Sequence, residues 1–142
     1  MTIASLISGR EQTIIQCSPD QLVSDAAALL ADKRIGALPV MEDGEVVGIF
    51  SERDLLYCVA KVGAEALTRP IREVMTSPAI YISPEEKALD TLALMTRRRI
   101  RHLPVVDRGK LVAFVSIGDI VKYRIDKIEA EASQLREYIQ LA

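Results

Sequence analysis

The sequence predicts an α+β protein that consists of two β-α-β-β-α repeats followed by a long C-terminal helix. The main observation is an internal duplication: residues 13–57 align without a gap on residues 78–122, with fifteen identical pairs at a constant offset of 65. The second observation is composition, because 49% of the 142 residues are hydrophobic and only 4% are aromatic, with no tryptophan. A chain of this size and composition can bury an aliphatic core and is not expected to be disordered.

Each repeat contains the same series of elements. A short apolar stretch ends at a Ser-Pro pair, and a helix with one apolar face follows. Two apolar runs around a glycine-containing turn predict a β-hairpin, and a second helix begins at a serine. The apolar stretches are residues 14–17 and 79–82, the hairpin strands are residues 37–41 with 46–50 and 102–106 with 111–115, and the closing helices begin at Ser51 and Ser116.

The predicted organisation has four parts. They are an N-terminal segment with the first repeat (residues 1–62), a linker (63–77), the second repeat (78–124) and a C-terminal helical extension (125–142). Around the last part, apolar residues recur at alternating spacings of four and three, which is a heptad pattern: Val121, Ile125, Ile128, Ala132, Leu135 and Ile139. We expect this helix to pack on its copy in a homodimer; the alternative is that it folds back on its own core.

Composition and charge also argue against several classes of function. The 18 basic and 20 acidic residues give a net charge of −2, without an overall bias toward nucleic acid. Two cysteines, Cys17 and Cys58, form neither a disulfide framework nor a metal set. No apolar run approaches the ~18 residues of a membrane span, and no signal peptide opens the chain, so we expect a cytoplasmic protein without a membrane partner. No catalytic residues are predicted, because acid–base pairs, activated nucleophiles and metal ligands are absent at recognisable spacings.

A Ser-x-x-Asp motif stands at the end of each hairpin, as Ser51 with Asp54 and as Ser116 with Asp119. In the structural interpretation, the serine caps a helix and the aspartate lies in its first turn, where the helix dipole favours negative charge. In the functional interpretation, the free amides of the helix N-terminus bind a phosphate and the carboxylate accepts hydrogen bonds from a ribose diol. The motif alone leaves both interpretations open.

The two hairpins carry a resemblance to a known family. Each contains the pattern I-x-x-L-P-V, then a turn with an acidic residue and glycine, and then a Ser-x-x-Asp ending: residues 48–54 read Gly-Ile-Phe-Ser-Glu-Arg-Asp, and residues 113–119 read Ala-Phe-Val-Ser-Ile-Gly-Asp. This duplicated pattern resembles a tandem pair of CBS domains, a Bateman module. One departure is Ala113, which stands where the family usually has glycine.

The resemblance implies a fold with two clefts. In the family, the two repeats pack about a pseudo-twofold axis, the aspartate anchors ribose, and the serine faces ribose or phosphate. The first nucleotide-binding cleft would therefore contain Ile49, Ser51, Arg53, Asp54, Ala79, Ile80, Ile100 and His102. The second would contain Ile14, Ile15, Ile35, Arg101, Phe114, Ser116 and Asp119.

The function implied by the resemblance is a non-catalytic, adenine-nucleotide-binding regulatory or sensor module that acts as a homodimer on an unknown effector protein. AMP is the expected ligand, followed by ADP or ATP, NAD and S-adenosylmethionine. The alternative is a protein-interaction scaffold whose clefts bind no nucleotide.

The Arg97–Arg101 cluster is either a solvated face or an anion-attracting rim, and nucleic acid is not the expected partner. His102 is either a strand residue or a phosphate contact.

Overall fold

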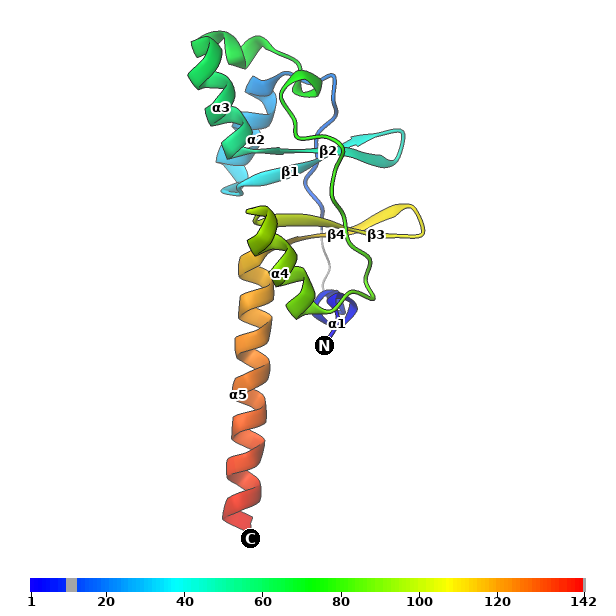
Figure 1. Cartoon of the computed structure of the whole chain (residues 1–142), viewed down its shortest axis with the longest axis vertical. Helices are drawn as coiled ribbons and strands as arrows, with labels where there is room; N and C mark the ends of the chain where they lie inside the picture. The colour runs from blue at the N-terminus through cyan, green and yellow to red at the C-terminus, as the bar shows by residue number, and fades with distance from the viewer. Residues whose placement is uncertain (10–12, 142) are drawn as a thin grey trace.

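The computed structural model describes residues 1–9 and 13–141, which form two similar halves and a long projecting helix (Figure 1). Each half contains a two-stranded antiparallel hairpin with helices packed beside it. The elements, in chain order, are α1 (Ile3–Ile7), α2 (Val23–Lys33), β1 (Ala37–Glu42), β2 (Glu45–Ser51), α3 (Glu52–Val62), the 3₁₀ helices η1 (Gly63–Thr68) and η2 (Ile71–Glu73), α4 (Ala88–Arg98), β3 (His102–Asp107), β4 (Lys110–Ser116) and α5 (Ile117–Leu141).

The two hairpins repeat the same backbone details. Ala37 pairs with Ser51 in the first and His102 pairs with Ser116 in the second, and each ladder shifts register at the equivalent position, after Val40 or Val105. Both turns place a non-glycine residue and then a glycine at positive φ. The duplication therefore extends to the irregularities of the fold.

The first predicted strand of each repeat is reduced to one parallel bridge. Cys17 bridges Val40, and Ile82 bridges Val105. The Cys17 amide donates to the Pro39 carbonyl at 3.1 Å, and the Met41 amide donates to the Cys17 carbonyl at 2.8 Å. The ladder cannot extend toward residue 15, because proline has no N–H to donate at that position.

Each half has its own apolar core. The first core lies between α2, β1 and β2 and centres on Leu38, Val40 and Phe50, which are fully buried. The second core contains Leu103, Val105 and Ile120, together with α1 from the start of the chain. The N-terminal helix thus packs on the second half, although it precedes the first half in sequence; its Ile3 amide donates to the Glu86 carbonyl at 2.8 Å.

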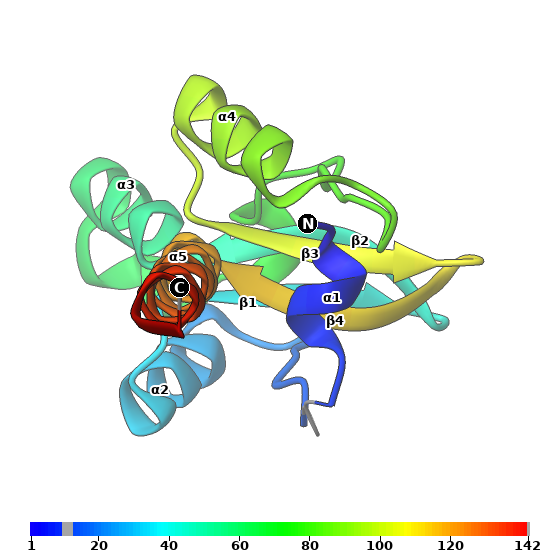
Figure 2. The same ribbon diagram turned by 90° about the horizontal axis from the view of Figure 1, so that it is seen from below.

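The last helix leaves the body of the protein. Ile120 is the one buried residue of α5, and Ile117 and Tyr123 pack against the second core. The helix beyond them extends away from both hairpins (Figures 1 and 2). The helix therefore does not fold back on its own core. None of the helices in the described part of the chain combines the length and apolarity that crossing a membrane requires.

Candidate functional site

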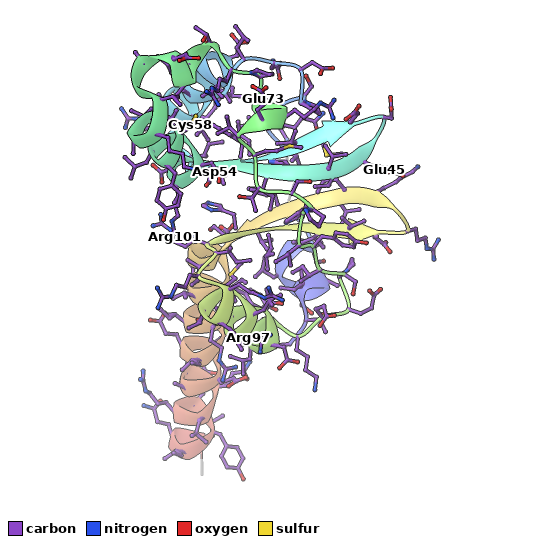
Figure 3. The ribbon with its side chains drawn as sticks, turned by 45° about the horizontal axis from the view of Figure 1, so that its top comes forward. Glu45, Asp54, Cys58, Glu73, Arg97 and Arg101 are labelled. Carbon is purple, nitrogen blue, oxygen red and sulfur yellow. The ribbon has the colours of Figure 1, made fainter. Side chains whose placement is uncertain are left out.

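A cavity of about 220 Å³ lies between the two halves. Its walls come from the ends of the first hairpin, the start of α3, residues 76 and 78–80, and the corner between α4 and β3. All eight residues predicted for the first cleft line this cavity: Ile49, Ser51, Arg53, Asp54, Ala79, Ile80, Ile100 and His102. Figure 3 shows Asp54 in the first half and Arg101 in the second half close to the junction between them.

Asp54 is held at the N-terminus of α3 by a reciprocal capping box. The backbone amide and hydroxyl of Ser51 donate to Asp54 Oδ2 at 2.9 and 3.0 Å, and the Asp54 amide donates to Ser51 Oγ at 3.2 Å. Its other oxygen, Oδ1, accepts a hydrogen bond from the Thr76 hydroxyl at 2.9 Å. The carboxylate is thus fixed in orientation at a helix N-terminus, where an anion or a diol can be bound.

The linker contributes to the site as a short added strand. Thr76 and Ile49 exchange two backbone hydrogen bonds of 2.9 Å, so the linker pairs with the outer edge of β2. Gly48 allows this approach: a Cβ there would lie 2.9 Å from the Thr76 carbonyl oxygen and 2.7 Å from Met75 Sδ. The linker therefore brings the Thr76 hydroxyl to Asp54 because residue 48 has no side chain.

Two polar contacts join the halves across the cavity. Arg53 Nη1 donates to the carbonyl of Arg99 at 2.9 Å, and Arg101 Nη2 lies 3.9 Å from Glu52 Oε1. Arg99 adopts a left-handed backbone at the end of α4, which turns the chain toward the first half. The arginines are exposed, so their guanidinium groups are accessible to an anionic ligand.

Arg101 lies at a different cleft from the one predicted. It was expected at the second cleft, by analogy with the crossed arrangement of the repeats, but it lines the first cavity. The reason is local: the residue follows the left-handed turn at Arg99, and its side chain extends to Glu52 on α3. Arg98 and Arg99 line this cavity too, so it has three more arginines than expected.

His102 lies on the cavity wall and is stacked on Phe114. The two rings are nearly parallel, at 11°, with centroids 5.7 Å apart. Burial lowers the pKa of His102, and the neighbouring Arg101 cation lowers it further. The imidazole is therefore neutral near pH 7 and offers the cavity a hydrogen-bonding ring instead of a charge.

The remaining residues predicted for the second cleft do not line this cavity: Ile14, Ile15, Ile35, Phe114, Ser116 and Asp119. Ile15 and Ile35 pack against the first core. Ile14, which precedes Ile15 in the chain, is half-buried. Ser116 and Asp119 form a second capping box: the Ser116 amide donates to Asp119 Oδ2 at 2.8 Å, and the Asp119 amide donates to Ser116 Oγ at 3.0 Å. By the offset of 65, the counterpart of Thr76 is residue 11, which lies outside the described residues.

The sequence prediction missed several cavity residues, among them Gly36, Glu52, Tyr57 and Thr76. Tyr57 could have been found from spacing, because it follows Asp54 by three positions and therefore shares its helix face. Thr76 has no such signal, since its place depends on how the linker pairs with β2.

Neither cysteine suggests chemistry at this site, and no cluster of metal-ligating side chains occurs within residues 1–9 and 13–141. Cys17 is buried in the first core, and burial raises the pKa of its thiol to about 11.

Comparison with known families matches the CBS domain twice, over residues 11–61 and 71–126. The chain belongs to the CBS domain family. It is 35% identical to the CBS domain-containing protein YhcV of Bacillus subtilis over 72% of this chain and 73% of that protein. It is also 35% identical to the mitochondrial CBS domain-containing protein CBSX3 of Arabidopsis thaliana over 87% of this chain, which spans 63% of that relative's length.

Solved CBS structures have the same fold. A protein with CBS domains from Burkholderia ambifaria is 36% identical, with a TM-score of 0.82 over 89% of this chain and 95% of that one. The structure of CBSX2 in complex with AMP is 25% identical, with a TM-score of 0.77 over 88% of this chain and 97% of that one. The chain is thus a tandem CBS pair with an α+β fold and a long C-terminal helix.

Proposed function

We propose that this CBS pair is a non-catalytic regulatory module that binds an adenine nucleotide, with AMP as the preferred ligand, in the cavity between its halves. The observation that supports this most strongly is the position of Asp54: its carboxylate is fixed at a helix N-terminus and lines a cavity whose opposite wall carries arginines. This arrangement can bind a ribose diol and a phosphate together. The structure of CBSX2 in complex with AMP, which has the same fold, supports the choice of ligand.

Each part of the nucleotide has a matching surface. The adenine would lie between apolar side chains of the two halves, which are Ile49, Ala79, Ile80 and Ile100. The ribose hydroxyls would donate to Asp54, and the phosphate would lie near the first turn of α3 and the exposed guanidinium groups of Arg53 and Arg101. ADP, ATP, NAD and S-adenosylmethionine share the adenosine part and are the next candidates.

Binding would act on the contact between the halves. Arg53 donates to the Arg99 carbonyl, so a phosphate that binds Arg53 competes with this hydrogen bond. A ligand that binds one placement of the halves more tightly shifts the protein toward that placement. We propose that this shift, in a cytoplasmic homodimer, is the signal that an effector protein recognises, and that the module itself catalyses no reaction.

An interaction scaffold without a nucleotide ligand is the second candidate function. Its support is that both oxygens of Asp54 already have protein partners, so the aspartate has a structural role even without a ligand. The two functions differ in what Asp54 does beyond capping.

A thermal-shift panel on refolded, nucleotide-free protein tests the proposal. The compounds are AMP, ADP, ATP, NAD and S-adenosylmethionine, with GMP as the base control. A ligand at a hundred times its dissociation constant stabilises the fold by about 2.7 kcal/mol, which raises the melting temperature by several degrees. We expect this rise with AMP and not with GMP. No rise with any adenine compound at millimolar concentration would contradict the proposal and favour the scaffold.

A further inference from the structure

The apolar stripe of α5 is open to solvent in the described structure. Beyond Tyr123, which packs against the second core, the helix extends away from the body (Figures 1 and 2). The large side chains of the stripe are all at least two-fifths exposed: Val121 42%, Ile125 50%, Ile128 48%, Leu135 59% and Ile139 64%. A continuous apolar seam on a projecting helix is unfavourable in water unless another surface covers it.

The heptad positions of the stripe place an apolar residue in every layer of a potential coiled coil. Ile125, Ala132 and Ile139 occupy position a, while Val121, Ile128 and Leu135 occupy position d. Position d combines valine, isoleucine and leucine, so the core residues supply an apolar seam, and the charges beside the seam distinguish the possible orientations. The seam runs from the first turns of the helix nearly to residue 141, so two copies can pair over most of α5.

The charges beside the seam favour a parallel pair. Arg124 and Glu131 occupy position g, and Glu129 and Arg136 occupy position e. In a parallel, in-register pair, each g residue faces the e residue five positions later on the second copy. Arg124 then faces Glu129, and Glu131 faces Arg136. Both contacts join opposite charges, and the twofold symmetry doubles them.

The antiparallel arrangement brings like charges together. If two copies overlapped along the full seam in opposite directions, position e would face e and position g would face g. Glu129 would then lie against Glu129 of the second copy, and Glu131 against Glu131. Like charges at these positions oppose that pairing.

We propose that α5 pairs with α5 of a second copy of this chain as a parallel, in-register coiled coil. This inference rests on the homodimer of the proposed function and specifies its interface. It places the two CBS bodies next to each other at the same end of the dimer. Each body has its own nucleotide cavity, so the two cavities lie in adjacent subunits.

Cysteine cross-linking tests the orientation. In the 142-residue chain carrying Cys58→Ser, the substitutions Ile125→Cys and Ile139→Cys are made separately. Cys17 is buried and is left in place. A parallel pair places each position a opposite itself, so both variants should form interchain disulfides in mild oxidant. Ser133→Cys, on the outer face, is the control that should remain a monomer on a non-reducing gel. Disulfides at one position only, or at neither, would overturn the proposal, because an antiparallel pair can bring a residue opposite itself at only one point.

Two charge-swap variants provide a second test. Glu129→Arg with Arg136→Glu, and Arg124→Glu with Glu131→Arg, each keep the net charge but create repulsive g–e contacts. We expect each alone to dimerise at least tenfold more weakly by sedimentation equilibrium, and an equal mixture to form heterodimers. Wild-type dimer affinity in both variants alone would overturn the inference. A thermal shift with AMP in the same samples separates this outcome from a failure of the nucleotide-binding proposal.

Discussion

The two halves of the molecule share their capping chemistry but differ around it. In both, a serine at the end of the hairpin and an aspartate three residues later form a reciprocal capping box, with Ser51 and Asp54 in one and Ser116 and Asp119 in the other. In the first half the Thr76 hydroxyl also donates to Asp54, whereas the counterpart of Thr76 in the second half, residue 11, lies outside the described residues. Duplication thus preserves the motif that starts a helix, down to both hydrogen bonds of the capping box.

The residues at the junction differ more strongly. Gly36 and Ala37 in the first half correspond to Arg101 and His102 in the second. All four line the same cavity, so the site combines a small, open side with a cationic, aromatic one. The two halves have similar backbones at this junction but different side chains. The two walls of the cavity therefore differ chemically, which suits a ligand whose two ends also differ.

The largest expected effect comes from Asp54→Ala. We predict that AMP affinity falls at least tenfold, because hydrogen bonds to a charged group contribute roughly 1.5–3 kcal/mol each. The free energy of unfolding should fall by about 1 kcal/mol through the lost cap. Titration calorimetry and urea unfolding measure the two changes.

Asp119→Ala is the matched control for this prediction. It removes the equivalent capping box from the second half and should cost a similar stability, yet leave AMP binding at the first cavity unchanged. Equal loss of AMP affinity in both variants would show that Asp54 acts only through stability.

Gly48→Ala tests the close approach of the linker. The added Cβ would lie 2.9 Å from the Thr76 carbonyl oxygen, so the linker must move away from β2. We predict a loss of about 1–3 kcal/mol in urea unfolding, as for other overpacked sites. The reverse change at the equivalent residue, Ala113→Gly, should cost only about 0.5–1 kcal/mol, since Ala113 is buried in the second core without such a clash. Unchanged stability of Gly48→Ala would contradict the linker contact.

Arg101→Gln tests whether the cationic wall of the cavity contacts the phosphate of the ligand. Its side chain is 61% exposed and its ion pair with Glu52 is long, so stability should hardly change. AMP affinity should fall about twofold to fivefold, as the loss of an exposed charge contact implies. Arg97→Gln, at a residue that does not line the cavity, is the control, and calorimetry at low salt is the measurement. Equal affinities in the two variants would exclude Arg101 as a phosphate contact.

The smallest effect concerns the pH dependence of stability. Burial lowers the pKa of His102 in the folded protein, so the unfolded chain binds a proton more readily. The contribution of the neutral imidazole is therefore present above the unfolded pKa of about 6.5 and is lost as the pH falls through that value toward the folded pKa. His102→Gln should reduce the loss of stability between pH 7.5 and 5.5 in urea unfolding. An identical pH dependence in wild type and variant would contradict this role.

The sequence predicted the two repeats well because the duplication aligns their hairpins and the helices beside them. The hairpins and helices follow from local patterns that occur in both copies, and the eight residues of the first cleft follow from the family resemblance. The sequence could not show that proline at position 39 restricts the preceding stretch to a single bridge. It also gave no signal for the packing of α1 on the second half or for the place of Arg101, because both depend on contacts between segments distant in the chain.

A structure of the protein crystallised with AMP tests the proposed site most directly. We predict AMP in the cavity between the halves, with its ribose hydroxyls within hydrogen-bond distance of Asp54 and its phosphate near Arg53 and Arg101. The hydrogen bond between Arg53 and the Arg99 carbonyl should be lengthened or lost. AMP bound away from Asp54, or a cavity without AMP at saturating concentration, would contradict nucleotide binding at this site.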